Sequence, residues 1–531
     1  MATTLTEGGL APLAPHQRIV ALDVIRGFAL LGIFLMNIEW FNRPISELGA
    51  GIPVGVAGLD HAIDWFVHTF VRSKFWTMFS LLFGMGFAVM LARAQSAGRS
   101  FLGPYLRRTA ALAVFGLAHG VLLWTGDILL SYASAAAVLL LALFGRAWQG
   151  LLLIAVLAGA AALLKAPVGG FIPVVALALL VALYLRSERM VRLAGIDWPL
   201  PSVVLGGLAL AMAVGGGVGI ALQGARFAPL LFGSMAMLLV AWLVHRFREP
   251  RGLRTLRAGL FLYFAPVLAM LIGAAASMLA PAGQGPQQQT PEKKQQVEER
   301  RAEHRATVAE ERRIMTTGSY TEAVRFRAKE YLGDYAGNSG FLAIVLALFL
   351  VGAWFVQSGV MTEPARHLPL FRRLAFVALP LGTAVTVASS LLATSHVPGE
   401  NTQPWQLAMG LQMLGALPMS LGYMAVLVLL LQSAAWSRWL GWLAPTGRMA
   451  LTHYLSQTAI CSLVFYGYGL GLWGMSRAGQ MAFVVAVFAL QVLLSRWWLA
   501  RFRYGPLEWA WRSITYLQVP RMRQDVVAQP A

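Results

Sequence analysis

The sequence predicts an all-α integral membrane protein with about fourteen transmembrane helices and both termini in the cytoplasm. Of the 531 residues, 58% are hydrophobic and 12% are charged, whereas roughly a quarter of an ordinary soluble domain is charged. Apolar runs recur at the length of about 20 residues that spans a hydrocarbon core ~30 Å thick. The basic residues behind the net charge of +19 cluster in short loops. This placement argues against a soluble multidomain enzyme and against nucleic acid binding.

The individual spans are predicted from the apolar runs and from the polar segments between them. They occupy residues 18–40, 75–94, 108–125, 128–145, 149–165, 170–186, 199–221, 228–246, 256–279, 340–357, 374–394, 405–432, 447–470 and 478–498. The loops after the second, sixth, eighth, tenth and last spans are rich in arginine, which places them in the cytoplasm. No cleavable signal precedes the first span, so we expect that span to direct its own insertion.

The spans and loops divide the chain into five predicted regions. These are an N-terminal transmembrane core (1–146), additional helices (147–280), an extracytoplasmic loop (281–338), a C-terminal transmembrane region (339–516) and a cytoplasmic tail (517–531). The loop has a Gln-rich start, and its mixed charge predicts a solvated helix. Within the core, an amphipathic helix near 59–72 is expected in the outer interface, with Asp60, Asp64 and His68 in water.

The first span carries more polar side chains than an anchor needs. Asp23 and Arg26 lie near one end, and Asn37 and Glu39 lie near the other. Burying charge in hydrocarbon is costly, so such groups usually line a cavity or pair with one another. We therefore expect this span to contribute to a functional site.

Five stretches form a set that is more specific than any one of them. In chain order they are LDVIRGFALLGIFLMN, SKFWTMFSLLFGMG, FGLAHGVLLWTGDILLSYA, APTGRMALTHYLSQT and RYGPLEWAWRSIT. Together, from Leu22 to Thr515, they resemble the YeiB-like family of bacterial polytopic membrane proteins. The chain departs from the usual member by extra spans within 149–257 and by the Gln-rich insert.

This family is similar to a broader group of transmembrane acyltransferases, which includes heparan-alpha-glucosaminide N-acetyltransferase and the acyltransferase-three proteins. The resemblance implies a bacterial inner-membrane enzyme that moves an acyl group from cytoplasmic acyl-CoA to an extracytoplasmic glycan or lipid headgroup. A homodimer is compatible with it. In acyltransferase-three proteins the first span carries an arginine, ten residues and then a histidine. Here Arg26 matches the arginine, and Asn37 stands at the histidine position.

Acyl transfer needs a general base, a group that orients it and stabilisation of an oxyanion. His119 is the best candidate base, and Asp127 follows eight residues later, on the same face if the helix continues. Asn37 is the candidate oxyanion donor. The alternative interpretation makes His119 a satisfied core histidine and Asp127 a helix cap.

Candidate substrate-binding residues lie at both ends of the spans. At the inner end, Arg26 and Arg448 suit CoA phosphates because guanidinium groups match phosphate oxygens, and His453 follows five residues after Arg448. The outer candidates are Asp60, Asp64 and Lys74. The spacing of His61, Asp64 and His68 is not a known ligand signature, so we expect no metal.

Two other functions remain open at this stage. Many spans with polar groups and glycines also suit a transporter or exporter of a small molecule or lipid precursor, although no inverted repeat is evident. A sensor or scaffold without catalysis is the third alternative. Acyl-CoA turnover that requires His119 would separate the enzyme from both.

Overall fold

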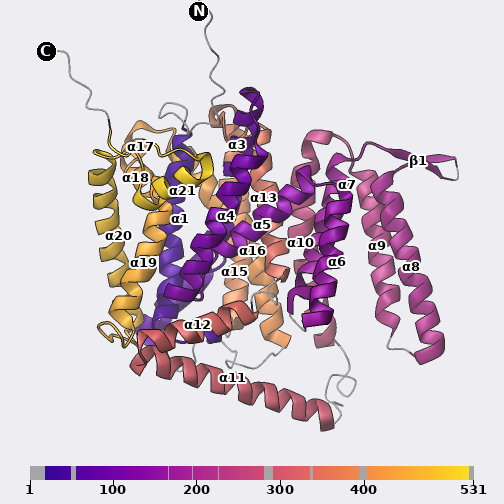
Figure 1. Ribbon diagram of the computed structural model, residues 1–531, viewed down its shortest axis with the longest axis horizontal. Coiled ribbons are helices and arrows are strands. Elements are labelled where there is room, and N and C mark those ends of the chain that lie inside the picture. Colours follow the sequence, from indigo (N-terminus) through magenta and orange to yellow (C-terminus); the bar gives the residue numbers. More distant parts are fainter. Residues whose placement is uncertain are drawn as a thin grey trace, which may run out of the picture.

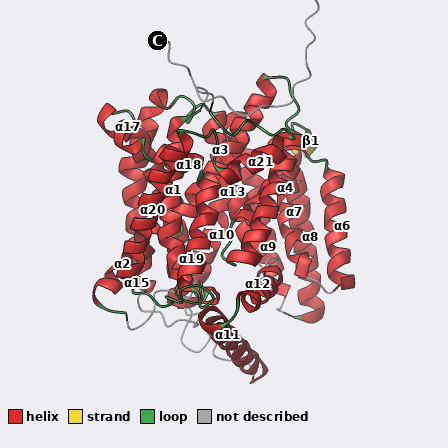
Figure 2. Cartoon of the chain, turned by 60° about the vertical axis from the view of Figure 1, so that its left-hand side comes forward, coloured by secondary structure: helices red, strands yellow, loops and turns green. Residues whose placement is uncertain are grey.

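The computed structural model describes residues 18–48, 56–164, 167–193, 195–224, 227–279, 291–334, 339–393 and 403–524. Most of these residues are helical, and the long helices stand side by side in a bundle (Figure 1, Figure 2). Among the described residues, ten helical segments are long and apolar enough to cross a membrane, and three shorter apolar helices accompany them. These features confirm an all-α polytopic architecture, whereas the number of fourteen spans stays a prediction.

The first part of the chain supplies ten α-helices and one hairpin. The helices are α1 (Val20–Asn37), α2 (Gly58–Phe66), α3 (Lys74–Ser96), α4 (Leu102–Ala118), α5 (Leu129–Phe144), α6 (Ala147–Leu164), α7 (Ile172–Arg186), α8 (Leu200–Gln223), α9 (Ala228–Arg246) and α10 (Arg254–Leu279). Between α7 and α8, β1 (Met190–Leu193) pairs antiparallel with β2 (Ile196–Pro199), with Met190 opposite Pro199.

The second part begins with two helices of the predicted loop and continues into the C-terminal bundle. Its helices are α11 (Pro291–Thr317), α12 (Tyr320–Asp334), α13 (Ser339–Gln357), α14 (Leu368–Arg373), α15 (Leu379–Ala393), α16 (Gln403–Leu430), α17 (Ala434–Leu440), α18 (Leu443–Arg448), α19 (Ala450–Phe465), α20 (Arg477–Leu499) and α21 (Pro506–Tyr516). The helix predicted in this loop, at residues 298–313, is confirmed as part of α11.

The two ends of the bundle carry different elements. The start of α1 lies near α21 and α18 at one end, whereas α11 and α12 lie across the opposite end (Figure 1). Glu311 of α11 fastens that end, because its carboxylate accepts hydrogen bonds from the backbone N–H groups of Ile45 (2.8 Å) and Ser46 (3.0 Å). The segment that follows α1 is thereby hydrogen-bonded to α11.

Helices α3 and α13 cross at very close range in the buried centre. A Cβ added to Gly84 would lie 2.1 Å from the backbone oxygen of Phe349, and one added to Gly352 would lie 2.1 Å from that of Leu81. Small residues at such crossings let helix backbones approach and pack in a membrane, where the hydrophobic effect does not drive association. This crossing fixes α3, which forms one wall of the site described below.

The segment near 59–72 differs from the sequence expectation. It forms α2 and a π-helical turn, Val67–Val71. Its polar side faces the protein: Asp64 pairs with Arg477 of α20, and His68 Nδ1 lies 3.0 Å from Ser390 Oγ of α15. Phe66 is instead half exposed. The prediction of water-facing Asp64 and His68 was wrong because their partners are remote in sequence.

Candidate functional site

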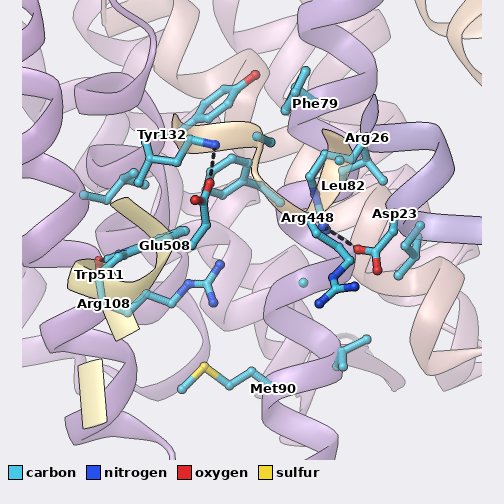
Figure 3. A pocket seen from close by; sticks show the side chains of 18 of the residues that line it. Asp23, Arg26, Phe79, Leu82, Met90, Arg108, Tyr132, Arg448, Glu508 and Trp511 are labelled. Atoms are coloured by element: carbon cyan, nitrogen blue, oxygen red, sulfur yellow. Dashed lines mark hydrogen bonds and ion pairs between the residues drawn. The ribbon is translucent and has the colours of Figure 1, made fainter. Parts of the chain in front are cut away.

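A cavity of about 250 Å³ opens among α1, α3, α4, α5, α18, α19 and α21 (Figure 3). Its polar lining gathers arginines from five segments near the end of the bundle where α1 begins: Arg18, Arg26, Arg93, Arg108, Arg448 and Arg512. Farther in, the lining is apolar or aromatic: Ile33, Phe79, Leu82, Phe83, Ile128, Leu129, Tyr132 and Tyr454. The cavity therefore joins a cationic part to an apolar part.

Two carboxylates also line the cavity, which leaves a formal excess of four positive charges among its side chains. Asp23 accepts hydrogen bonds from Arg26 (Nη1 to Oδ1, 3.0 Å) and from Arg18 (Nη1 to Oδ2, 3.3 Å). Arg448 Nη2 donates to the backbone oxygen of Arg503 (3.3 Å), and its Nε is buried without a hydrogen-bond partner in the described part of the chain. Guanidinium groups in this number suit an anionic ligand such as a phosphate ester.

The second carboxylate, Glu508, accepts hydrogen bonds from α19. Glu508 lies on α21. It accepts hydrogen bonds from the backbone N–H groups of Leu451 (2.7 Å) and Thr452 (3.0 Å) and from the Thr452 hydroxyl (2.6 Å). It thus satisfies N–H groups in the first turn of α19, which have no partner within their own helix. Burial raises the pKa of the Glu508 carboxyl above its usual value. These contacts give Glu508 a structural role, in joining α21 to α19.

His119 and Asp127 are in direct contact beside this cavity. Helix α4 ends at Ala118, a π-helical turn runs from His119 to Leu123, and Trp124 is extended. The chain then folds back, so that His119 Nδ1 lies 2.9 Å from Asp127 Oδ1, and both side chains are buried. The sequence placed this pair together correctly, but a chain reversal, and not a continuing helix, brings them into contact. π-Helical turns of this kind are frequent at functional sites.

Each member of the pair has a second partner that the sequence analysis missed. His119 Nε2 lies 2.9 Å from Thr458 Oγ1 of α19. Asp127 Oδ2 accepts hydrogen bonds from the Leu130 backbone N–H (2.9 Å) and from the Tyr331 hydroxyl of α12 (3.0 Å). Asp127 is therefore an orienting partner of His119 and also a partner for the first turn of α5. The structural alternative for Asp127 is confirmed by the bond to Leu130, and its catalytic role stays a prediction.

Tyr454 connects the cavity to the histidine. Its side chain lines the cavity, and its ring centroid lies 5.0 Å from that of His119. The Tyr454 hydroxyl is buried and has no hydrogen-bond partner among the residues that the structure describes. The Tyr454 side chain therefore lies between the cavity and the His119 ring.

Helix α12 covers the other side of the pair. Arg327 is fully buried and donates to the backbone oxygens of Val121 (3.2 Å) and Leu122 (3.0 Å), at the end of the π-helical turn. Tyr320 donates to the same Leu122 oxygen (3.1 Å). The predicted extracytoplasmic loop therefore contributes directly to the surroundings of His119.

The remaining sequence candidates do not line the cavity. Asn37 is buried at the end of α1, and no hydrogen bond between described residues joins it to His119. His453 Nε2 lies 2.6 Å from Ser495 Oγ, within the contact of α19 with α20. Lys74 is fully buried and donates to the His68 backbone oxygen (3.4 Å), and Asp60 accepts the Ala478 N–H (3.0 Å). Asp64 belongs to the ion pair with Arg477 described above.

Comparison with known proteins finds one family model and relatives over nearly the whole chain. Residues 355–518 match the family described as "Protein of unknown function (DUF418)". The chain is 26% identical over 516 residues to the "Uncharacterized protein YxaH" of Bacillus subtilis (strain 168), covering 96% of both chains. It is 26% identical over 519 residues to the "Uncharacterized protein YeiB" of Escherichia coli (strain K12), covering 94% of this chain and 96% of that one. These similarities support a YeiB-like family, as the five stretches predict; no solved structure matches the chain.

Proposed function

We propose that the protein is an acyltransferase of the bacterial inner membrane, with fourteen spans and both termini in the cytoplasm. It would take an acyl group, for example acetyl, from cytoplasmic acyl-CoA and deliver it to an extracytoplasmic glycan or lipid headgroup. The observation that carries the proposal is Tyr454, whose side chain lines the arginine-rich cavity and packs on the His119 ring. A phosphate-binding region and a base with its orienting carboxylate thus lie on two sides of one side chain.

The roles follow from the chemistry of the cavity and of the His119–Asp127 pair. Arg26 and Arg448, with the other lining arginines, would bind the nucleotide phosphates, since charge-assisted bonds to phosphate are strong. The apolar part would hold the acyl-pantetheine arm. The whole cavity, at about 250 Å³, is smaller than the roughly 300–1,000 Å³ usual for a drug-sized ligand. His119 would act as the base and Asp127 would hold its ring. Asn37 receives no role, because no contact links it to this pair.

The test is release of CoA from acetyl-CoA by the purified full-length protein in detergent, with wild type compared with His119→Ala. We expect release by the wild type and a loss of roughly 10²-fold or more in the variant, the scale of a missing general base. His304→Ala is the matched control, because His304 is an exposed histidine on α11.

Two results would count against this function. Release that survives in His119→Ala would remove His119 from the reaction. Failure of the wild type both to bind acetyl-CoA in calorimetry and to release CoA would overturn the acyltransferase proposal. Flux of a small solute in proteoliposomes, without acetyl-CoA turnover, would then favour the transporter.

A further inference from the structure

The hydrogen bonds around His119 fix where its proton lies. An ionised Asp127 can only accept hydrogen bonds, so His119 Nδ1 carries a hydrogen toward Asp127 Oδ1 at 2.9 Å. In the neutral imidazole, Nε2 then has a free lone pair. In this tautomer the Thr458 hydroxyl, 2.9 Å away, is the donor to Nε2. The base is therefore already hydrogen-bonded to a specific hydroxyl within the protein.

Both neighbours of His119 are held in place. Asp127 Oδ2 accepts from the Leu130 N–H and from the Tyr331 hydroxyl, so the carboxylate cannot rotate away without losing two bonds. Thr458 lies on α19, and the competing acceptor for its hydroxyl, the Tyr454 backbone oxygen one turn earlier, is more distant at 3.3 Å. Asp127, His119 and Thr458 thus have the carboxylate, imidazole and hydroxyl order of an activated nucleophile.

Thr458 is also placed between the two substrates of the proposed reaction. It lies one turn after Tyr454, which lines the donor cavity. On the opposite side, His119 and Asp127 are covered by α12, at the end of the bundle where the acceptor would approach. Displacement of the Tyr454 side chain would connect the cavity with the surroundings of Thr458.

We propose that Thr458 is the nucleophile that carries the acyl group in a double-displacement reaction; this inference rests on the acyltransferase function proposed above. In the first step, His119 Nε2 takes the Thr458 proton, Oγ1 attacks the thioester carbonyl carbon, and the carbon–sulfur bond breaks. His119 then gives the proton to the leaving thiolate, so that CoA leaves as a thiol.

In the second step, His119 removes the proton from the acceptor hydroxyl or amine, whose oxygen or nitrogen attacks the acyl-threonine ester. The carbon–Oγ1 bond breaks, and His119 returns the proton to Thr458. This order lets CoA leave toward the arginines before the acceptor binds from the other side. Donor and acceptor therefore never need to occupy the buried site together.

The experiment uses acetyl-CoA labelled in the acetyl group, with purified full-length protein and no added acceptor. Four proteins are compared: wild type, Thr458→Val, which keeps the side-chain shape without the hydroxyl, Thr458→Ser, which restores a hydroxyl, and Ser456→Ala as a control on the same helix. Rapid CoA release and protein-bound acetyl are measured, and the acetylated residue is mapped by peptide mass spectrometry.

We expect a burst of CoA release and an acetyl ester on residue 458 in wild type, Thr458→Ser and Ser456→Ala. In Thr458→Val the burst should fall roughly 10³-fold or more, with acetyl-CoA binding and thermal melting retained. CoA release at the wild-type rate by Thr458→Val, or an acetyl group mapped to His119, would overturn the inference while leaving the acyltransferase function intact. Absence of a burst from every protein, wild type included, with acetyl-CoA binding retained, would overturn the double-displacement step alone. Absence of acetyl-CoA binding as well would overturn the acyltransferase function too.

Discussion

Glu508 is a single buried carboxylate that joins α21 to the first turn of α19. Replacing it with Ala leaves the N–H groups of Leu451 and Thr452 buried without their acceptor. Each such loss costs about 1–3 kcal/mol. We therefore expect Glu508→Ala to lower the melting temperature in detergent clearly, and Glu508→Gln, which keeps one acceptor oxygen, to lower it less. Equal melting of Glu508→Ala and wild type would contradict this role.

The same residue predicts a pH dependence of stability. Burial raises the pKa of Glu508 above its usual 4.5, so the folded protein binds this proton more tightly than the unfolded chain does. The stabilisation from protonation is then fully present below about pH 4.5 and is lost as the pH rises through the folded pKa. Since glutamine does not titrate, the melting temperature of wild type minus that of Glu508→Gln should fall as the pH rises above about 4.5. A constant difference across this range would contradict the prediction.

Arg448 offers a residue-scale test of donor binding. Its buried Nε has no hydrogen-bond partner among the described residues, so a ligand phosphate could complete its hydrogen bonding. Arg448→Ala should raise KM for acetyl-CoA roughly tenfold, the effect of about 1.4 kcal/mol of lost binding, and leave kcat within a few-fold. Arg192→Ala, an exposed arginine in β1, is the control. A loss in kcat with an unchanged KM would assign Arg448 to the reaction step or to folding.

Single residues also mark the limit of sequence reasoning. His119 and Asp127 could be paired from sequence because they are eight residues apart and both are polar within apolar runs. Thr458 could not, since it is 339 residues from His119 and a lone threonine in an apolar helix is ordinary. The same holds for Arg327 and Tyr331, which come from the predicted extracytoplasmic loop. Only the packing of α12 against the π-helical turn reveals them.

At the scale of elements, α12 is hydrogen-bonded to the π-helical turn that contains His119. Arg327→Met removes two donors to the backbone oxygens of Val121 and Leu122. Backbone amides in 119–130 should then exchange hydrogen faster, because unsatisfied buried carbonyls destabilise the turn. Arg325→Met, an exposed arginine on the same helix, should leave exchange unchanged. Equal exchange in both variants would show that α12 does not hold this turn.

The crossing of α3 with α13 gives a second test at this scale. Gly352→Ala would place a Cβ 2.1 Å from the Leu81 backbone oxygen, and backbone cannot move aside as a flexible side chain can. We expect a loss of about 1–3 kcal/mol or more, as for overpacking, seen as a lower melting temperature. Gly340→Ala, on the same helix with open space around its Cβ, should melt like wild type or slightly higher. Similar melting of the two variants would mean that the helices can separate at little cost.

The orientation of α2 explains why some elements resist prediction. Its alternation of polar and apolar residues correctly indicates a helix with two different faces. The pattern does not say which face meets water, because that depends on Arg477, 413 residues farther along the chain, which pairs with Asp64. In a membrane protein the face with Phe66 can contact lipid, so the usual assumption of polar residues outside is reversed.

For the whole molecule, the helical architecture is predictable from sequence because hydrocarbon leaves few choices. A backbone that crosses it must satisfy its own hydrogen bonds, so each apolar run becomes a helix. The boundaries and the number of spans are harder to predict from sequence than the helical architecture. Short apolar helices such as Leu129–Phe144 and Leu230–Arg246 fall near the minimum length that crosses a membrane. The cavity is a property of the assembled bundle, because its lining comes from segments between Arg18 and Tyr516.

The orientation of the whole molecule can be tested through its cysteine content. The single cysteine, Cys461, is fully buried and should not react with a membrane-impermeant maleimide. The arginine-rich loops predict that the end with β1 faces the cytoplasm and that α11 faces outward. His304→Cys, exposed on α11, should therefore be labelled in intact spheroplasts, and Arg192→Cys, exposed in β1, only after permeabilisation. The reverse pattern would invert the topology, and with it the side from which acyl-CoA must enter the arginine-lined cavity.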